Sequence, residues 1–457
     1  MTVYDEIAET DGDNACRVWL RRVFDLKAEI VAFASRRARP QQGDKPGEFV
    51  SYLKGSFNFG LRITFGDGGP DAIIRFPKPG HTLQAIADEK LANEVQVMKY
   101  LSKNTTIPLP RVVSWGLTEE SPQQLGPFII MDFVDGIRLS TFLKKPTKDD
   151  QEDAILKSEI DLAVLDTIYD QLADYMIQFS KLDFARIGAI SEDPNSNTWS
   201  VSGRPLTYNM NELATSSGYP VDKFPSNQFT SAHEYFLYLT DEHWVHFQTQ
   251  RNLADDQEDA QRRFLARYRF KQLIPSYCIE DAGPFKLFCD DLQPSNMLID
   301  PETLQITAVL DFEYTNVMPA QFAYDPPWWL LLLGPDMWLE RYSLEGFLSR
   351  YEPRMEQFLQ AMERIEAKLE SKPPSGPRLS TRMRDSWRSK HFWFNYGIRK
   401  SLDIDAVYWA TLHDDAFGVE SLDDKARAEM ESMKELKMEQ LKAYKEECTA
   451  RFSKDGE

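Results

Sequence analysis

Two acidic side chains and one amide stand at a spacing that suits the chemistry of phosphates. In the segment FCDDLQPSNMLIDPETLQITAVLDFEYTN, residues 288–316, Asp291 precedes Asn296 by five residues, and Asp311 follows two short apolar runs. Phosphoryl transfer needs a carboxylate that receives or orients the proton of a hydroxyl, and hard oxygen ligands for magnesium ions that bridge the phosphates. Asp291 could meet the first need, and Asn296 with Asp311 the second.

The elements around these residues must bring them together. The apolar run 297–299, the turn 300–302 and the run 306–310 predict a β-hairpin. This hairpin returns the chain to its starting end, so we expect Asp311 to lie beside Asn296. The spacing alone also fits an ordinary acidic turn followed by a hairpin.

The whole pattern resembles a known motif. Asp-x-x-x-x-Asn, a hairpin and then Asp-aromatic-Glu look like the catalytic loop and metal-binding motif of the aminoglycoside phosphotransferase and choline kinase superfamily, whose members are relatives of protein kinases. The phrases CDDLQPSNMLID, TAVLDFEYTN and PAQFAYDPPWW resemble the large fungal branch. The resemblance implies Asp291 as catalytic base, Asn296 and Asp311 as metal ligands and Glu313 as a neighbouring carboxylate. It also implies ATP or GTP and Mg²⁺ as cofactors.

The loop departs from the family at two positions. Most members have His-Gly or His-Asn before the catalytic aspartate, where the histidine fixes the loop, whereas this chain has Cys289 and Asp290. A cysteine bonds more weakly than a histidine. Asp290 places a second carboxylate beside Asp291, and we expect like-charge repulsion to raise the pKa of one of them.

The N-terminal part of the chain resembles the nucleotide-binding half of the same fold. The segment KGSFNFGLRITF, residues 54–65, resembles a nucleotide-binding loop with Gly55, Ser56 and Asn58 at its tip, where backbone amides can contact phosphates. Arg75 stands where the family usually has a lysine that reaches the phosphates, and arginine keeps the charge with a different geometry. Glu94, on a predicted helix, is placed to pair with Arg75. The alternative is that Arg75 and Glu94 are two separate surface charges.

A short apolar strand, residues 128–131, leads into residues 132–134 and resembles the hinge whose backbone holds the adenine edge. Met131 and Phe133 are therefore expected at the nucleotide. No GxxxxGK[ST] motif occurs in the chain, which excludes a P-loop site.

The coarse order of elements is α+β. Residues 16–39 predict a helix, 40–47 a linker, 59–65 and 72–76 a hairpin, and 86–102 a helix that ends before the prolines at 108 and 110. Helices dominate from about residue 140, 371–377 is a loop or linker candidate, and 423–454 is a charged helix.

With the resemblance, this order predicts a bilobal protein-kinase-like fold with a small β-rich N-lobe and a large helical C-lobe. The predicted domains are a helical extension, 1–48, a nucleotide-binding N-lobe, 49–134, a catalytic and substrate-binding C-lobe, 135–421, and a charged C-terminal helix, 422–457. A cleft is expected between the lobes.

Aromatic side chains in the helical part could form a cage for a cation or a ring system, although core packing is the commoner role of such residues. The candidates are Trp199, Tyr235, Phe236, Trp244, Trp387, Phe392, Trp393 and Tyr396. Asp325, in AYDPPWW, resembles a family aspartate that we interpret as a loop brace or helix cap.

Composition narrows the possible partners. A formal net charge of −19 disfavours nucleic acid, because the phosphate backbone repels an acidic surface. No run is long and apolar enough to span a membrane, and the acidic N-terminus lacks the pattern of a secretory signal. The four cysteines are scattered, which is typical of reduced thiols, so we expect a cytoplasmic protein. The sequence leaves the oligomeric state undetermined.

Three functions compete at this stage. The first is an active kinase of a small molecule that bears a hydroxyl, such as an amino sugar, an amino alcohol or a secondary metabolite. The second is a non-catalytic nucleotide-binding or scaffold protein of the same fold, which Arg75 and the Cys289-Asp290 pair motivate. The third, a protein kinase, is disfavoured because GxGxxG, His-Arg-Asp and Ala-Pro-Glu motifs are missing. The intact set of Asp291, Asn296 and Asp311 favours the first.

Overall fold

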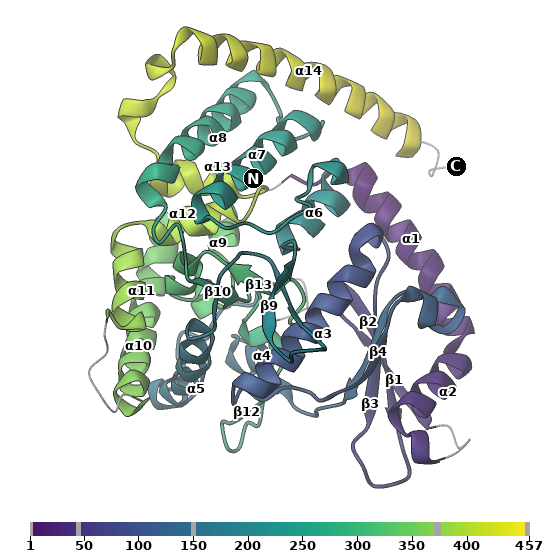
Figure 1. Cartoon of the computed structure of the whole chain (residues 1–457). Coiled ribbons are helices and arrows are strands. Elements are labelled where there is room, and N and C mark those ends of the chain that lie inside the picture. The colour runs from purple at the N-terminus through teal and green to yellow at the C-terminus, as the bar shows by residue number, and fades with distance from the viewer. Residues whose placement is uncertain (1–2, 43–46, 148–151, 370–375, 453–457) are drawn as a thin grey trace.

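A five-stranded antiparallel sheet in the order β1-β2-β3-β5-β4 forms the first of two lobes in the computed structural model, which describes residues 3–42, 47–147, 152–369 and 376–452 (Figure 1). Two helices precede this sheet and one crosses it. The elements of the lobe are α1 (Glu6–Asp25), α2 (Lys27–Ala38), β1 (Glu48–Lys54), β2 (Asn58–Thr64), β3 (Ala72–Pro77), α3 (Ala87–Asn104), β4 (Val112–Gly116) and β5 (Phe128–Asp132).

Both faces of the sheet are covered, which explains its apolar strands. On one face Phe59, Leu61 and Ile63 of β2 form a cluster with residues of α1 and α2 such as Trp19 and Val23. On the other face α3 packs its apolar stripe against β5. A strand that is buried on both faces loses the strict alternation of polar and apolar residues.

The predicted hairpin, the strand at 128–131 and the helix at 86–102 are confirmed as β2 with β3, as β5 and as α3. The predicted helix at 16–39 is in fact two helices, because the backbone leaves helical geometry at Leu26. The strands β1 and β4 were not predicted. Residues 371–375 of the predicted linker lie outside the described residues.

The second lobe is mostly helical. Its helices are α4 (Leu139–Leu143), α5 (Leu162–Ser180), α6 (Tyr208–Ser216), α7 (Ala232–Thr249), α8 (Gln257–Tyr277), α9 (Pro335–Arg341), α10 (Leu344–Leu369), α11 (Leu379–Arg388), α12 (His391–Ile398), α13 (Ile404–Val407) and α14 (Asp424–Phe452). Its short strands are β6 (Ile137–Arg138), β7 (Asp183–Phe184), β8 (Ala189–Glu192), β9 (Trp199–Gly203), β10 (Phe285–Phe288), β11 (Met297–Ile299), β12 (Ile306–Val309) and β13 (Asn316–Met318).

The second predicted hairpin is confirmed as β11 and β12, which pair antiparallel. β6 adds to its edge, directly after the crossing from one lobe to the other. The chain thus forms a β-rich unit first, then crosses to a helical unit that contains one internal hairpin. This order confirms the predicted α+β bilobal architecture. Among the described residues, no helix has the length and apolar character that crossing a membrane requires.

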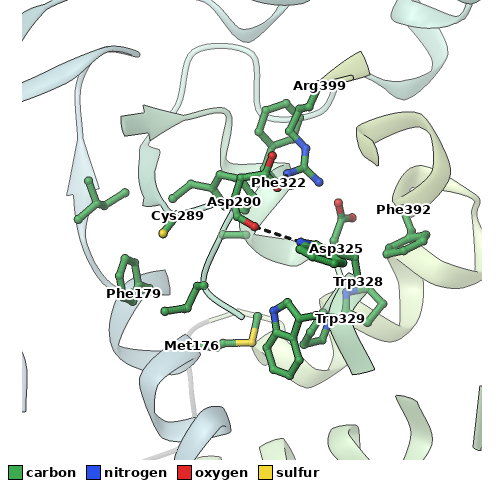
Figure 2. Close-up of a pocket in the computed structure, with 16 residues that line it drawn as sticks. Met176, Phe179, Cys289, Asp290, Phe322, Asp325, Trp328, Trp329, Phe392 and Arg399 are labelled. Atoms are coloured by element: carbon green, nitrogen blue, oxygen red, sulfur yellow. Dashed lines mark hydrogen bonds and ion pairs between the residues drawn. The ribbon is translucent and has the colours of Figure 1, made fainter. Parts of the chain in front are cut away.

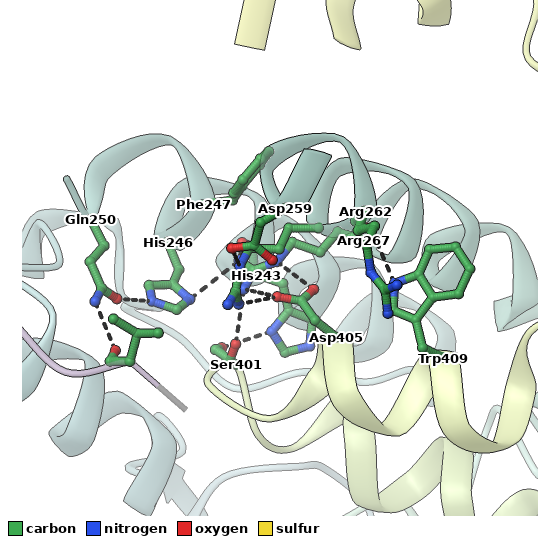
Figure 3. A network of polar contacts seen from close by, with 12 residues as sticks. His243, His246, Phe247, Gln250, Asp259, Arg262, Arg267, Ser401, Asp405 and Trp409 are labelled. Carbon is green, nitrogen blue, oxygen red and sulfur yellow. Dashed lines mark hydrogen bonds and ion pairs between the residues drawn. The ribbon is translucent and has the colours of Figure 1, made fainter. Parts of the chain in front are cut away.

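A buried polar network ties three helices of the second lobe together (Figure 3). Arg267 of α8 binds both carboxylate oxygens of Asp405 on α13 at 3.1 Å and contacts the ring of His246 on α7 at 3.2 Å. His243 shares a hydrogen bond of 2.7 Å with the hydroxyl of Ser401. These histidines are therefore structural members of the core.

The last helix, α14, runs along the outside of α7 and α8 and ends near α1 (Figure 1). The hydroxyl of Tyr444 accepts a hydrogen bond of 2.8 Å from the backbone N–H of Glu6, and Arg451 pairs with Asp11 at 3.0 Å. α1 also packs on α6. The two ends of the chain thus link the small lobe to the large one.

Candidate active site

A cleft of about 730 Å³ opens between the lobes. Its upper wall is formed by residues of β1 to β3, α3 and β5, and its floor is formed mainly by residues of the segment 290–313. All ten of the predicted site residues line it, namely Gly55, Ser56, Asn58, Arg75, Glu94, Met131, Phe133, Asp291, Asn296 and Asp311. Residues separated by more than 200 positions in the chain therefore meet at one place.

Asp291 lies on the loop between β10 and β11. The amide of Asn296 donates to its Oδ2 at 2.6 Å and to its backbone carbonyl at 3.0 Å, and the amide of Gln293 donates to its Oδ1. These bonds fix the direction of the carboxylate. Burial raises the pKa of Asp291 to about 6, against the opposing effect of the two amides. A carboxyl with such a pKa is suited to exchange a proton near neutral pH.

The hairpin brings Asp311 to the same end of the cleft. The backbone N–H of Leu310 donates to the carbonyl of Asn296 at 2.7 Å, so the first residue after β12 lies against the last residue before β11. Asp311 itself has a positive φ of 62°. This left-handed conformation is uncommon for a residue other than glycine, and such backbone is often found at functional sites.

A cation fits the residues at this point. Oδ1 of Asp311 is buried and has no hydrogen-bond partner in the described part of the chain, although Arg75 forms an ion pair with this atom at 3.5 Å. Burial, followed by repulsion from Glu313, raises the pKa of Asp311 well above its usual value. The side-chain nitrogen of Asn296 donates to Asp291, which leaves the side-chain oxygen Oδ1 of Asn296 for a ligand. One carboxylate and one amide oxygen are hard donors of the kind that Mg²⁺ takes from a protein when phosphates and waters complete its shell.

Arg75 connects the two walls of the cleft. It lies on the central strand β3, and its guanidinium contacts Glu94 of α3 at 2.5 Å and Asp311 at 3.5 Å. The Glu94 side chain is only 2% exposed, so the pair is largely desolvated. The structure thus brings together the predicted partners Arg75 and Glu94, and it adds Asp311 to them.

The predicted nucleotide loop is the turn between β1 and β2. Gly55 donates its N–H to the carbonyl of Asn58 at 2.9 Å, which closes the turn, and Ser56 lies at its tip. Asn58 is buried, and its amide donates to Glu313 at 3.0 Å. The side chain of Asn58 therefore holds the two lobes together at the cleft.

The predicted hinge passes along the cleft at the end of β5. Met131 pairs with β3 and β4 in the sheet. The N–H of Phe133 donates to the carbonyl of Asp71 at 2.8 Å, so this N–H is already used within the protein. The guanidinium of Arg62 lies 3.9 Å from the centre of the Phe133 ring.

Sequence reasoning missed Lys90. This residue lies on α3 one turn before Glu94, is 3% exposed and forms an ion pair with Glu313. Burial alone would raise the pKa of Glu313, but Lys90 and Arg75 hold it below its usual value. The signal was present, because positions four apart share a helix face and Glu94 had already been placed at the cleft.

The negative charge of Asp290, next to Asp291, is compensated by a cation. Its carboxylate forms an ion pair with Arg399, and its carbonyl accepts a hydrogen bond of 3.0 Å from the indole N–H of Trp328 (Figure 2). Asp325 accepts hydrogen bonds from Ser386 at 2.5 Å and from Asn395 at 2.9 Å. The expected role of Asp325 as a brace agrees with this buried position.

The eight aromatic residues suggested for a cage are not on the wall of the cleft in the described part of the chain. Five of them are buried in the core, namely Tyr235, Phe236, Phe392, Trp393 and Tyr396. The aromatic residues of the large lobe that do line the cleft are Tyr208 and Trp328.

Comparison with solved structures finds similar but distant proteins. A thermostable mutant of aminoglycoside phosphotransferase APH(4)-Ia, in ternary complex with AMP-PNP and hygromycin B, shares 15% identity over 81% of this chain and 97% of its own, with a TM-score of 0.41. Aminoglycoside phosphotransferase APH(3'')-Id from Streptomyces rimosus shares 14% over 84% and 98%, with a TM-score of 0.37. Plasmodium vivax ethanolamine kinase shares 12% over 87% and 82%, with a TM-score of 0.40.

Comparison with sequences gives a more direct result. No curated protein matches the chain. The model of the phosphotransferase enzyme family matches residues 60–358, a span that begins in β2 and includes the loop with Asp291, the β11–β12 hairpin and Asp325. Because this match covers more than half of the 457 residues, the chain belongs to the phosphotransferase enzyme family.

Proposed function

We propose that this protein is an ATP-dependent small-molecule kinase that transfers the γ-phosphoryl group to a hydroxyl of a small metabolite. The observation that carries the proposal is the meeting of Asp291, Asn296 and Asp311 at one end of the cleft. Membership of the family supports the reaction class. The proposed acceptor is a small molecule that bears a hydroxyl. Nucleic acid is disfavoured as a partner, because the chain has a net charge of −19.

Each residue has a task in this proposal. Asp291, held by Asn296 and Gln293, accepts a hydrogen bond from the acceptor hydroxyl, orients its oxygen toward the phosphorus and takes its proton. Arg75 and the backbone amide of Ser56 hold the phosphates, and Gly55, whose N–H closes the turn, shapes the loop beside them. Asn296 and Asp311 would hold magnesium, which when bound neutralises charge on the phosphate oxygens.

The lobes divide the work in the same proposal. Residues 49–134 bind the nucleotide, with Met131 and Phe133 along the adenine, and residues 135–421 carry the catalytic loop and the acceptor site. Residues 1–48 and 422–457 are a helical extension and a charged helix that support the two lobes. ATP is the proposed nucleotide.

The test is magnesium-dependent ADP release over a panel of hydroxyl-bearing metabolites, with wild type beside Asp291→Asn. We expect a panel member to be turned over, and we expect the substitution to lower kcat by roughly 10²–10⁴-fold, the usual contribution of a general base. The matched control is Asp300→Asn, which makes the same change in the exposed turn between β11 and β12. Equal activity of Asp291→Asn and wild type would remove Asp291 from the mechanism.

A second candidate is nucleotide binding without turnover. It is favoured by Arg75, whose guanidinium is already paired with Glu94 and Asp311. The same panel separates the two candidates. Binding of ATP with no ADP release from any acceptor would favour this second function.

A further inference from the structure

We propose that Arg399 is a positioning residue that aims the catalytic loop through its ion pair with Asp290. The inference rests on the proposed function, because it assigns the residue that orients Asp291 for transfer.

Asp290 is held at two points. Arg399 pairs with its carboxylate from the end of α12, and the indole N–H of Trp328 donates 3.0 Å to its backbone carbonyl. Figure 2 shows both residues near Asp290, with the bond from the indole of Trp328 drawn as a dashed line. Since Asp291 is the next residue, fixing both the side chain and the carbonyl of Asp290 fixes the peptide that leads into the proposed base.

Arg399 is itself fixed before it reaches the loop. Its guanidinium lies 4.9 Å from the centre of the Phe288 ring and 5.0 Å from that of Phe322. Its Nε donates to the carbonyl of Asn395 at 2.8 Å, and its side chain is only 10% exposed. A stacked and partly desolvated guanidinium loses little further freedom when it binds a carboxylate.

The contacts of Arg399 continue into the core of the large lobe. Asn395, which accepts from Arg399 through its carbonyl, donates its amide to Asp325 at 2.9 Å. Asp325 also accepts from Ser386 on α11. The loop is thus connected through Arg399 to α11 and α12. Lys400, the next residue, lines the cleft, so the same segment borders the space in which the acceptor is proposed to bind.

The kinetic test compares wild type with Arg399→Gln, Arg399→Lys and a matched control. Because a misplacement of about 1 Å can cost roughly 10²-fold in rate, we expect Arg399→Gln to lower kcat about 10–100-fold. The KM for ATP should stay within about 3-fold, and Arg399→Lys, which keeps the charge, should recover part of kcat. The control is Arg382→Gln, since Arg382 also stacks on a ring, that of Tyr324 at 4.3 Å, and pairs with Glu280 at 2.8 Å, away from the loop.

A double-mutant cycle with Asp290→Asn shows whether Arg399 acts through Asp290. If it does, Arg399→Gln should change kcat by no more than about 3-fold in the Asp290→Asn background, because contacting residues are strongly non-additive. Independent losses that simply multiply would overturn the proposal. Asp290→Asn also breaks the ion pair from its more exposed end, so it serves in place of Arg399→Gln if that variant does not fold.

Hydrogen–deuterium exchange provides a readout that needs no turnover. We expect the amides of residues 289–296 to exchange at least about 10-fold faster in Arg399→Gln or Asp290→Asn than in wild type and Arg382→Gln, since local opening sets exchange rates. Unchanged exchange in this segment would overturn the proposal. Faster exchange in the two variants, combined with a wild type that turns over no acceptor, would instead count against the proposed function alone.

Discussion

Charge balance in the cleft explains several of the ion pairs between its two walls. Three carboxylates, those of Glu94, Asp311 and Glu313, face two cations, Arg75 and Lys90. These five side chains, which come from both walls of the cleft, therefore have one negative charge more than the cations compensate, which agrees with the raised pKa of Asp311. A divalent ion at Asp311 would remove this imbalance, which supports the proposed metal site.

The Lys90 pair can be tested by stability. Lys90→Met leaves Glu313 buried without its main counter-charge, and breaking a buried ion pair at one end typically costs about 3–5 kcal/mol. We therefore expect the free energy of unfolding, measured by urea denaturation, to fall by about that amount. Adding Glu313→Gln should restore part of it.

The control for this change is Lys103→Met. Lys103 lies on the same helix and pairs with Glu192 at 2.6 Å, but its side chain is 55% exposed. Exposed ion pairs contribute at most about 1 kcal/mol, so this variant should lose far less stability. Equal losses in the two variants would show that the Lys90 pair has no special importance.

Elements were predictable from the sequence where local patterns and tertiary packing agree. α3 has an apolar face and ends before two prolines, and the β11–β12 hairpin has two apolar runs around an Asp-Pro turn, so both were found. β1 and β4 were missed because each depends on pairing with a neighbouring strand. The break between α1 and α2 has no glycine or proline to mark it.

The same limit applies to the site. Asp291, Asn296 and Asp311 lie within 21 positions of one another, and a local motif predicts them. The bonds of Asn58 and Lys90 to Glu313, and of Arg399 to Asp290, join residues 109 to 255 positions apart. The pairs with Glu313 depend on how the two lobes pack together, and the Arg399–Asp290 pair depends on packing within the large lobe. Local patterns in a single sequence do not specify either kind of packing.

The helix α14 contains a buried lysine whose protonation is linked to folding. Lys437 donates to the carbonyls of Phe247 at 2.8 Å and Gln250 at 2.5 Å, and burial lowers its pKa to about 7. In the unfolded chain a lysine keeps a pKa of about 10.4. Between these values the unfolded chain binds more protons, so the folded state gains stability as the pH rises.

This linkage predicts a difference in pH dependence. From pH 7 to pH 9, the free energy of unfolding of wild type should rise by about 2 kcal/mol relative to Lys437→Met, as the proton linkage of one lysine allows. Urea denaturation at three pH values measures it. Lys434→Met, which changes a lysine paired with Glu431 on the same helix, should keep the wild-type slope. Parallel curves for wild type and Lys437→Met would contradict the low pKa.

At the scale of the molecule, the chain ends hold the lobes in position. α1 packs Trp19 against Phe59 and Phe76 of the small lobe, while its first residues contact α6 and α14 of the large lobe. The cleft is formed between these lobes, so its shape depends on helices outside the family match, which begins at residue 60. We therefore expect α1 to affect both stability and nucleotide binding.

Trp19→Ala tests this role. Trp19 is 4% exposed and donates its indole N–H to the carbonyl of Leu125 at 2.7 Å. Replacement of a buried tryptophan by alanine typically costs about 3–5 kcal/mol, and we expect a loss of that size in urea denaturation. Val18→Ala, at the adjacent position that is 61% exposed, should cost no more than about 0.5 kcal/mol. Similar small losses in both would mean that α1 does not support the small lobe.

The central claim is that the cleft binds a magnesium nucleotide at Asn296 and Asp311, beside Asp291. The most direct measurement is calorimetric titration of AMP-PNP into wild type and Asp311→Asn, each with and without Mg²⁺. We predict that Mg²⁺ tightens binding to wild type at least about 10-fold, which is about 1.4 kcal/mol, and that Asp311→Asn loses this gain. Equal binding with and without Mg²⁺ in wild type, or no binding at all, would contradict the account.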